Sequence, residues 1–415
     1  MRTGSLKLLV KNFSAQGLNT LLGLVFTIAG ARLMSLADYG ELRYMMTLLP
    51  LLMACTLPGF DSIILRKANL REQVPLRNIF YIRLVTGCVG ALSVSVALYF
   101  FSPALSASLK FLLLITALLL PFFETATGYK NYLIGIGLRN QSLNLVFFSR
   151  LTSMLLFLLL GLLIYSHYLS PLWIYPSYLL AIILPTIWTF SLIARKIRHA
   201  ENFFPIKWHA LILPAAVSTI ASLTYTYAYS MDKLWIRNLS GAQALAIYSI
   251  LVMVPQELAK LCDTSFPLYY KRLFFDRNTE KRKIHIGRAF FSLLTAIVVL
   301  LLYANTFKFF SPWIFGEKYS YPFYLCLLSG MLIFGQAFEY FNSHKIFAHH
   351  GSRGQFIYTL LNLALCSIFI PIGIKLGGLS GLLLALLFKQ LLLPIFYYSG
   401  VSITSKLHFD SRKFF

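Results

Sequence analysis

The chain has few charged residues. Of its 415 residues only 12% are charged, whereas 58% are hydrophobic, and the mean hydropathy is +0.71. An average soluble domain carries about 25% charged residues. The composition therefore excludes an ordinary soluble protein. The connections between the hydrophobic segments are also too short to form a separate soluble domain.

Acidic residues are particularly scarce. The chain has 14 Asp and Glu against 37 Lys and Arg, which gives a formal net charge of +23. The basic residues form clusters beside long apolar segments, and such clusters usually contact anionic lipid headgroups. We therefore expect membrane lipids, and not nucleic acid, to be the partners of this positive charge.

Motifs of soluble enzymes and metal proteins are missing. The five cysteines form no CxxC pair and no Cys/His cluster, which argues against a disulfide framework or a zinc site. The sequence contains no Walker A motif, no HExxH and no GxSxG. It therefore predicts neither an enzyme nor a pump that hydrolyses ATP by itself, and it predicts no cofactor or metal.

Long hydrophobic runs recur about twelve times, and each of them has the ~20 residues that a helix needs to cross a bilayer. The predicted fold class is an all-α integral membrane protein. The predicted spans cover residues 13–34, 42–63, 78–101, 107–128, 141–165, 171–194, 209–230, 242–264, 288–310, 323–344, 355–374 and 379–400.

The basic residues lie mostly in every second connection between these runs. Positive residues are retained on the cytoplasmic side during insertion, so this alternation predicts that both termini are cytoplasmic. The first apolar run follows three basic residues, as a secretory signal would. It is longer than a signal sequence, however, and no small-residue cleavage site follows it. We interpret it as a retained first span.

The chain resembles itself when it is shifted by half its length. A shift of 205 residues aligns four identical pairs: Arg32 with Arg237, Ser35 with Ser240, Ala37 with Ala242, and Pro50 with Pro255. Chance is an alternative explanation for so few identities. A true repeat would carry six spans onto six in the same orientation, which is a known transporter plan. It predicts two six-helix lobes, residues 1–200 and 201–415, that form a parallel pseudo-repeat.

Charged residues within a span are costly unless they are paired or hydrated. Glu257, Lys260 and Asp263 are spaced three residues apart and share one helical face. They can form the charged wall of a cavity or a proton-coupling site. Alternatively, they neutralise one another near the inner membrane surface.

Single basic residues lie deeper in other spans. Lys389 is near the middle of the last span, where it can act in transport or pair with Glu339 or Glu124. Arg150 lies inside the fifth span and has the same two interpretations. Arg83 is closer to the cytoplasmic end of its span, and we expect it to be an anchor that reaches back to the headgroups.

Two further polar features complete the candidate set. Asp61 lies near an inner span end, where we expect it to pair with Arg66. On the first span, Asn12, Gln16 and Asn19 share one face. Such a face lines a water-filled cavity or bonds to a neighbouring helix.

Several segments resemble polysaccharide flippases. The segment 31–40 (ARLMSLADYG) resembles the turn after their first span, and the resemblance continues at 59–60 and 64–66. Further matches in the same order are found at 232–233, 239–242, 247–249, 266–267, 314–316, 319 and 377–381. The chain is similar to O-antigen and capsule flippases (Wzx-like). These belong to the superfamily of multidrug-and-toxin extruders (MATE) and lipid II flippases.

The resemblance implies a MATE-like fold with a central cavity in a bacterial inner membrane. It also implies that undecaprenyl-diphosphate-linked oligosaccharide crosses to the outer leaflet by alternating access, for O-antigen, capsule or exopolysaccharide biosynthesis. Contact with the glycan polymerase machinery is a further expectation. Alternatives are an ion-coupled drug or small-molecule antiporter on the same fold, and a membrane glycan polymerase or ligase. The short outside loops argue against the latter.

Residue roles follow as hypotheses from this picture. Substrate-binding candidates are Arg150, Lys260, Lys389, Arg32, Arg237, Gln16 and Asn19, with Arg32 and Arg237 at the outer mouth. Candidates for coupling to H⁺ or Na⁺ are Glu257, Asp263 and Glu339.

Overall fold

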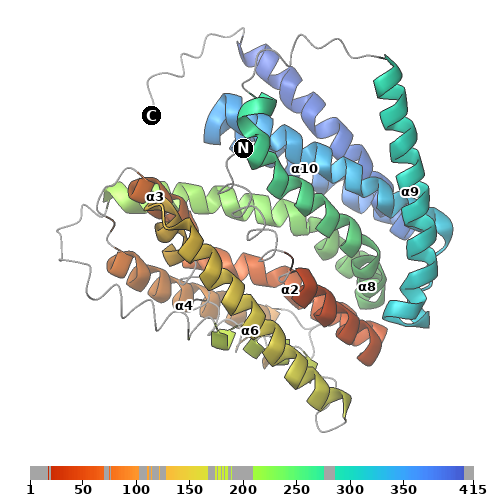
Figure 1. Ribbon diagram of the computed structural model, residues 1–415, viewed down its shortest axis with the longest axis horizontal. Helices are drawn as coiled ribbons and strands as arrows, with labels where there is room; N and C mark the ends of the chain where they lie inside the picture. The colour runs from red at the N-terminus through yellow and green to blue at the C-terminus, as the bar shows by residue number, and fades with distance from the viewer. Residues whose placement is uncertain are drawn as a thin grey trace. The chain divides into compact units, whose positions relative to one another are not determined.

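The computed structural model is described at residues 17, 20–69, 74, 76–101, 128–166, 209–274 and 286–405, and at scattered positions within 110–121 and 173–188. Over these residues the chain is almost entirely helical and has no β-strand (Figure 1). The predicted all-α fold class is therefore confirmed. The contacts within the chain divide it into two compact units, Met1–Thr226 and Tyr227–Phe415. The lobe boundary near residue 200 stays a prediction.

The first unit begins with an apolar helix, Thr20–Leu33. It continues with α2 (Leu36–Met53), the short 3₁₀ helix η1 (Ala54–Thr56), α3 (Gly59–Asn69), α4 (Leu76–Phe101) and α6 (Arg139–Tyr165). The second predicted span thus consists of α2 and α3 with a break between them. The break lies at Leu57, whose φ is +52°, whereas Pro50 lies within α2.

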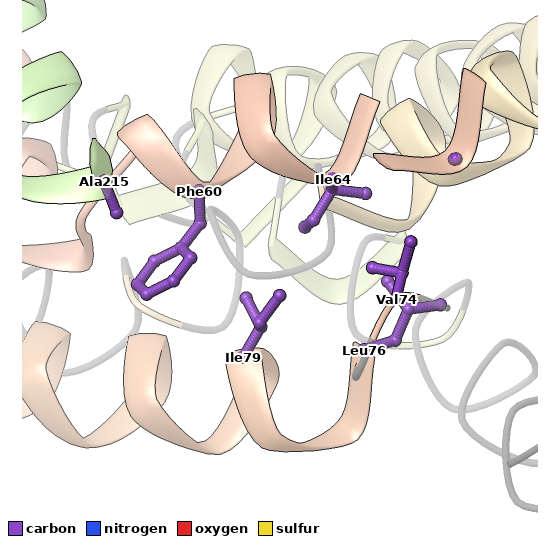
Figure 2. Close-up of a cluster of buried hydrophobic side chains, with 7 residues drawn as sticks. Phe60, Ile64, Val74, Leu76, Ile79 and Ala215 are labelled. Atoms are coloured by element: carbon purple, nitrogen blue, oxygen red, sulfur yellow. The ribbon is translucent and has the colours of Figure 1, made fainter. Parts of the chain in front are cut away.

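A buried apolar cluster holds α3 against α4 and against the beginning of α8 (His209–Phe274). Figure 2 shows the side chains of this cluster between these helices. The cluster consists of Phe60, Ile64, Ala68, Val74, Leu76, Ile79 and Ala215. Gly59 permits the close approach to α8. A Cβ atom at this position would lie 2.1 Å from the Ala215 carbonyl oxygen, and its N–H donates to Thr219 Oγ1 at 3.1 Å. The first turns of α8 therefore pack within the first unit.

The second unit contains the rest of α8, then α9 (Ile286–Phe315), η3 (Glu317–Tyr319) and α10 (Phe323–Ser405). Within α8, Gly241 has φ +89° and ψ 177°, a conformation that is essentially restricted to glycine. Two helices therefore meet at this residue. Their junction falls in the outside turn predicted between the seventh and eighth spans.

α10 also contains more than one crossing. Gly378 has φ +56°, and Gly373 and Gly381 lie so close that a Cβ atom on Gly373 would be 2.5 Å from the Gly381 carbonyl oxygen. Residues eight positions apart in a straight helix are about 12 Å apart, so α10 reverses direction here. A second apolar cluster packs the two resulting arms together: Ile346, Tyr358, Leu365, Leu393 and Tyr397.

Five helices in the described part of the chain are long and apolar enough to cross a membrane. Two of them, Ala215–Lys260 and Gly354–Gly400, have 46 and 47 residues, which is twice the length that a bilayer requires. Each contains one of the glycines with positive φ, Gly241 or Gly378, so each provides two crossings. The total of about twelve spans stays a prediction.

Candidate functional site

The deepest charged group of the last predicted span is paired. Lys389 Nζ lies 2.8 Å from Glu339 Oε2, and the two side chains are only 6% and 2% exposed. Both residues belong to α10, but they lie on different crossings. Of the two partners suggested by the sequence, Glu339 is therefore the one that the structure shows. Glu124 lies outside the described residues.

The other Glu339 oxygen, Oε1, accepts two more hydrogen bonds. Asn362 Nδ2 donates at 3.1 Å, and the Tyr229 hydroxyl of α8 donates at 3.2 Å. The Tyr229 ring stacks on Tyr340 with an interplanar angle of 4° and lies 6.0 Å from Lys389 Nζ. One cation and two hydrogen-bond donors thus compensate the oxygens of this buried carboxylate.

A second buried carboxylate, Asp232, lies nearby on α8. It is 5% exposed, accepts a hydrogen bond from the Tyr248 hydroxyl, and lies 3.7 Å from Lys233 Nζ. Cys366 connects the two carboxylates. Its thiol donates to Asn362 Oδ1 at 3.5 Å, and it is close enough to interact electrostatically with Lys389, Glu339 and Asp232.

We name this group the polar network. It consists of Tyr229, Asp232, Tyr248, Glu339, Asn362, Cys366 and Lys389, all in the second unit. The sequence predicted only part of this network. Lys389 and Glu339 were candidates because of their charge, whereas Asp232 was named only as part of the segment 232–233 that resembles polysaccharide flippases. Asn362 and Tyr248 are single polar residues in apolar runs, and without their neighbours they do not indicate a site.

The first unit has a buried ion pair of its own, which corrects one expectation. Arg83 is 1% exposed, and its Nη1 lies 2.6 Å from Asp61 Oδ1, while its Nε donates to the Thr56 carbonyl at 3.1 Å. The prediction of Arg83 as an anchor at the headgroups is wrong, because the carboxylate of Asp61, in the first turn of α3, holds the side chain in the interior. The side chain of Arg66 lies outside the described residues, so its pairing with Asp61 stays a prediction.

Arg150 on α6 is half-buried. Lys130, which precedes α6, interacts electrostatically with both Arg150 and Asp61, with repulsion from the first and attraction to the second. Arg150 therefore belongs to a group of basic residues.

The Lys260–Glu257 pair is more exposed. Lys260 Nζ lies 2.5 Å from Glu257 Oε1, and the two side chains are 49% and 33% exposed. Such a pair matches the self-neutralising interpretation of that cluster.

The remaining candidates differ in their exposure, and some of them lie outside the described residues. Arg32 is exposed and Arg237 is half-buried. Gln16 and Asn19 lie outside the described residues, and of Asp263 only the backbone, within α8, is described. In the part of the chain that the structure covers, no three His, Cys, Asp or Glu side chains converge on a metal position.

Solved structures of MATE transporters share this fold over almost the whole chain. The outward-facing and the inward-facing conformations of a multidrug resistance MATE family transporter of the MOP superfamily each superpose with a TM-score of 0.60. The outward-facing one is 16% identical and covers 97% of this chain and 96% of its own. For the inward-facing one these values are 15%, 94% and 96%. The fold is therefore MATE-like, as predicted.

A third solved structure, a MOP superfamily transporter from Pyrococcus furiosus, is described as having a binding pocket of reverse polarity that suggests a different function. It has a TM-score of 0.55 and 14% identity, and the match covers 96% of this chain and 94% of that one. The same fold thus occurs with pockets of different polarity.

The family assignment comes from the sequence. No curated protein sequence matches the chain significantly. The sequence profile of the family described as "Polysaccharide biosynthesis protein" matches residues 30–265, which is more than half of the chain. The predicted resemblance to polysaccharide flippases is thereby confirmed. The chain belongs to the polysaccharide biosynthesis protein family and is a multi-pass membrane protein of the flippase and transporter type with a MATE-like fold.

Proposed function

We propose that this protein is a flippase for lipid-linked glycans. Its substrate is an oligosaccharide joined to undecaprenol through a diphosphate, and it moves the substrate from the cytoplasmic to the outer leaflet for O-antigen, capsule or exopolysaccharide synthesis. The observation that supports this proposal most strongly is the family match over residues 30–265. A polysaccharide pathway needs a step that takes membrane-bound glycan units across the bilayer, and a MATE-like fold suits that step.

The physical difficulty of the reaction lies in the headgroup. Sugar hydroxyls and a diphosphate lose their hydration in hydrocarbon, and an unpaired hydroxyl alone costs about 2–7 kcal/mol there. A protein that alternates between two open states solves this problem when it encloses the headgroup in a polar chamber and leaves the lipid tail in the bilayer. Solved proteins of this fold occur in inward-facing and outward-facing conformations.

The candidate substrate-binding residues keep their roles within this proposal. Arg150 and Lys260 would attract the diphosphate, Arg32 and Arg237 would act at the outer mouth, and Gln16 and Asn19 would bind sugar hydroxyls. Lys389 has a more restricted role. Because Glu339 neutralises it at 2.8 Å, Lys389 can attract an anion only when that pair opens.

Coupling to an ion gradient is assigned to the same pair. Protonation of Glu339, or binding of Na⁺ to it, would remove the charge that balances Lys389. A buried charge without its partner costs about 3–5 kcal/mol, which is enough to favour another arrangement of the helices. Glu257 and Asp263 are the further coupling candidates. Glu257 is already paired with Lys260.

The proposal includes a location and an architecture. The chain would lie in a bacterial inner membrane with both termini in the cytoplasm. Two six-helix lobes, residues 1–200 and 201–415, would enclose the chamber. Contact with the glycan polymerase machinery on the outer side would pass the product to the next step.

Genetic complementation tests this function. In a strain that lacks the gene, we expect surface glycan to be lost and lipid-linked glycan to accumulate on the cytoplasmic leaflet, and the wild-type chain should restore the surface glycan. At equal protein levels, Arg150→Gln and Lys260→Gln should reduce the restored glycan several-fold. Lys345→Gln serves as a matched control. It also removes one exposed basic charge, at a residue that lies over the Tyr398 ring.

Two outcomes would contradict the proposal. Surface glycan that is unchanged after deletion, together with increased sensitivity to cationic drugs, would assign the protein to drug export on the same fold. Accumulated lipid-linked glycan that is accessible from the outside would show that translocation still occurs and would indicate a polymerase or ligase.

A further inference from the structure

Glu339 in the polar network accepts hydrogen bonds from several donors. Lys389 Nζ donates to its Oε2 at 2.8 Å. Its Oε1 accepts from Asn362 Nδ2 at 3.1 Å and from the Tyr229 hydroxyl at 3.2 Å. An ionised carboxylate can only accept, with about four lone-pair sites on its two oxygens. These donors therefore occupy most of the acceptor capacity of Glu339.

Asp232, the second carboxylate of the network, is also surrounded by donors. Its Oδ2 accepts from the Tyr248 hydroxyl, and its Oδ1 accepts from the backbone N–H of Lys233 at 2.8 Å. The Lys233 ammonium lies 3.7 Å from the same oxygen. Each carboxylate of the network is therefore accompanied by a lysine.

The amide of Asn362 has the orientation that a neighbouring carboxylate requires. Its Nδ2 faces Glu339, and its Oδ1 accepts from the Cys366 thiol at 3.5 Å. The Ser367 hydroxyl contacts Met231 Sδ at 3.7 Å, so this part of α10 packs against the turn of α8 that carries Asp232. The amide oxygen is a group that could bind a metal ion, but it is directed to Cys366 and not to Glu339.

A sodium ion would need the opposite arrangement. Na⁺ is close to Ca²⁺ in size, and Ca²⁺ binds about six to eight oxygen atoms at about 2.3–2.6 Å. Such oxygens must present lone pairs to the ion, whereas the groups that face Glu339 present hydrogens to it. Lys389 Nζ lies 2.8 Å from Oε2, so the ammonium is almost where a metal ion on this oxygen would be. Two cations at that place would repel each other strongly, because both side chains of the pair are buried.

We propose that the Lys389 ammonium takes the place of a metal ion in the polar network and prevents Na⁺ from binding to Glu339. Lys389 thus determines which ion this site accepts. A proton needs one lone pair and no shell of oxygen ligands, so the carboxylate can still be protonated. The choice of H⁺ as the coupling ion at Glu339 rests on the proposed transport function, whereas the exclusion of Na⁺ does not.

The same geometry predicts a sodium site once the ammonium is removed. A methionine side chain ends one atom earlier than lysine, so Lys389→Met frees the position of Nζ beside Glu339. The Asn362 amide can then rotate to present its oxygen, and the Tyr229 hydroxyl has lone pairs as well as a hydrogen. Oxygens of these three residues would surround a bound Na⁺.

Binding of Na⁺ to the purified full-length protein tests this inference. The melting temperature is measured in detergent while NaCl replaces choline chloride at constant ionic strength, and radioactive sodium measures the bound ion directly. The wild type should bind no more sodium than the double variant Glu339→Gln/Lys389→Met, which lacks the carboxylate. Lys389→Met should bind about one additional Na⁺ and melt about 2 °C or more higher in Na⁺, because a ligand that binds only the folded state stabilises it.

Matched variants separate the site from general charge and from folding. Lys375→Met also replaces a lysine by methionine, at an exposed position, and should respond to Na⁺ as the wild type does. The double variant keeps the shape of the network and should show no additional sodium. If Lys389→Met does not fold, Lys389→Gln is measured in its place, because its amide oxygen can itself bind Na⁺.

Sodium bound by the wild type and lost in the double variant would overturn the inference, because Glu339 would then accept Na⁺ beside Lys389. A folded Lys389 variant that binds no more sodium than the double variant would overturn it as well. None of these measurements involves a glycan, so their outcome is independent of the transport proposal, which surface glycan tests separately.

Discussion

Each of the two buried ion pairs is also held by hydrogen bonds to neighbouring groups. Glu339 pairs with Lys389 and accepts from Asn362 and Tyr229. Arg83 pairs with Asp61 and donates to the Thr56 carbonyl. Buried charge is costly unless it is paired. Removing one member of such a pair should therefore cost stability.

Replacing one partner of the Glu339–Lys389 pair should destabilise the protein strongly. In Lys389→Met the Glu339 carboxylate stays buried without its cation, and we expect a loss of about 3–5 kcal/mol in the free energy of unfolding. Glu339→Gln should leave the ammonium uncompensated and have a similar effect. The double variant Glu339→Gln/Lys389→Met buries no charge, so it should be more stable than either single variant.

Chemical unfolding of the purified protein in detergent measures all four members of this cycle. Lys375→Met, at an exposed lysine, is the control and should change the unfolding free energy by less than about 0.5 kcal/mol. Additive effects of the two single substitutions would mean that the pair does not contribute to folding in the membrane protein.

Close packing between helices depends on a few glycines, because glycine has no side chain that would hold the two backbones apart. Gly59 lets α3 touch the start of α8, and Gly373 and Gly381 let the two arms of α10 meet backbone to backbone. Small residues at such contacts allow membrane helices to pack through van der Waals contacts and close backbone approach. A glycine does not contribute to helix packing where no neighbouring side chain or helix is close to it. Gly161 on α6 has no atom within 4 Å of the position of a Cβ atom.

Alanine at these glycines should have opposite effects. In Gly381→Ala the new methyl group would lie 2.0 Å from the Gly373 carbonyl oxygen, so the arms of α10 must separate. We expect a lower melting temperature and reduced yield of folded protein. Gly161→Ala should be neutral or stabilising by up to about 1 kcal/mol, because alanine favours the helix and meets no neighbour. Thermal unfolding of both variants in detergent gives the comparison, and equal melting temperatures would contradict the packing described for α10.

Long apolar runs predicted the helices well, because a bilayer requires ~20 such residues whatever their neighbours are. The irregularities were harder to predict. The second predicted span breaks at Leu57, and Gly241 and Gly378, whose φ angles are positive, interrupt α8 and α10. Charges within spans marked Lys389, Glu339 and Arg150 as candidates. Their partners come from other helices, and the sequence contains no information about which helices touch.

For the whole molecule, the distribution of charge predicts the orientation in the membrane. The MATE-like fold is shared with proteins that are only 14–16% identical, so very different sequences adopt it. The family match covers residues 30–265 and includes parts of both units. Fold and family therefore follow from features spread over the chain. The direction of insertion depends on where the 37 Lys and Arg residues lie.

That direction can be measured at two lysines. The turn that contains η3 is predicted to be outside, and Lys318 in it is exposed. Lys67 near the end of α3 is predicted to be inside because basic residues cluster there.

In a variant without native cysteines, Lys318→Cys should react with a membrane-impermeant maleimide in intact spheroplasts. Lys67→Cys should react only after the membrane is permeabilised. The cysteine-free parent, which should not react at all, is the control for both. The opposite pattern would invert the proposed topology. Reaction of both residues from the same side would contradict an odd number of crossings between them.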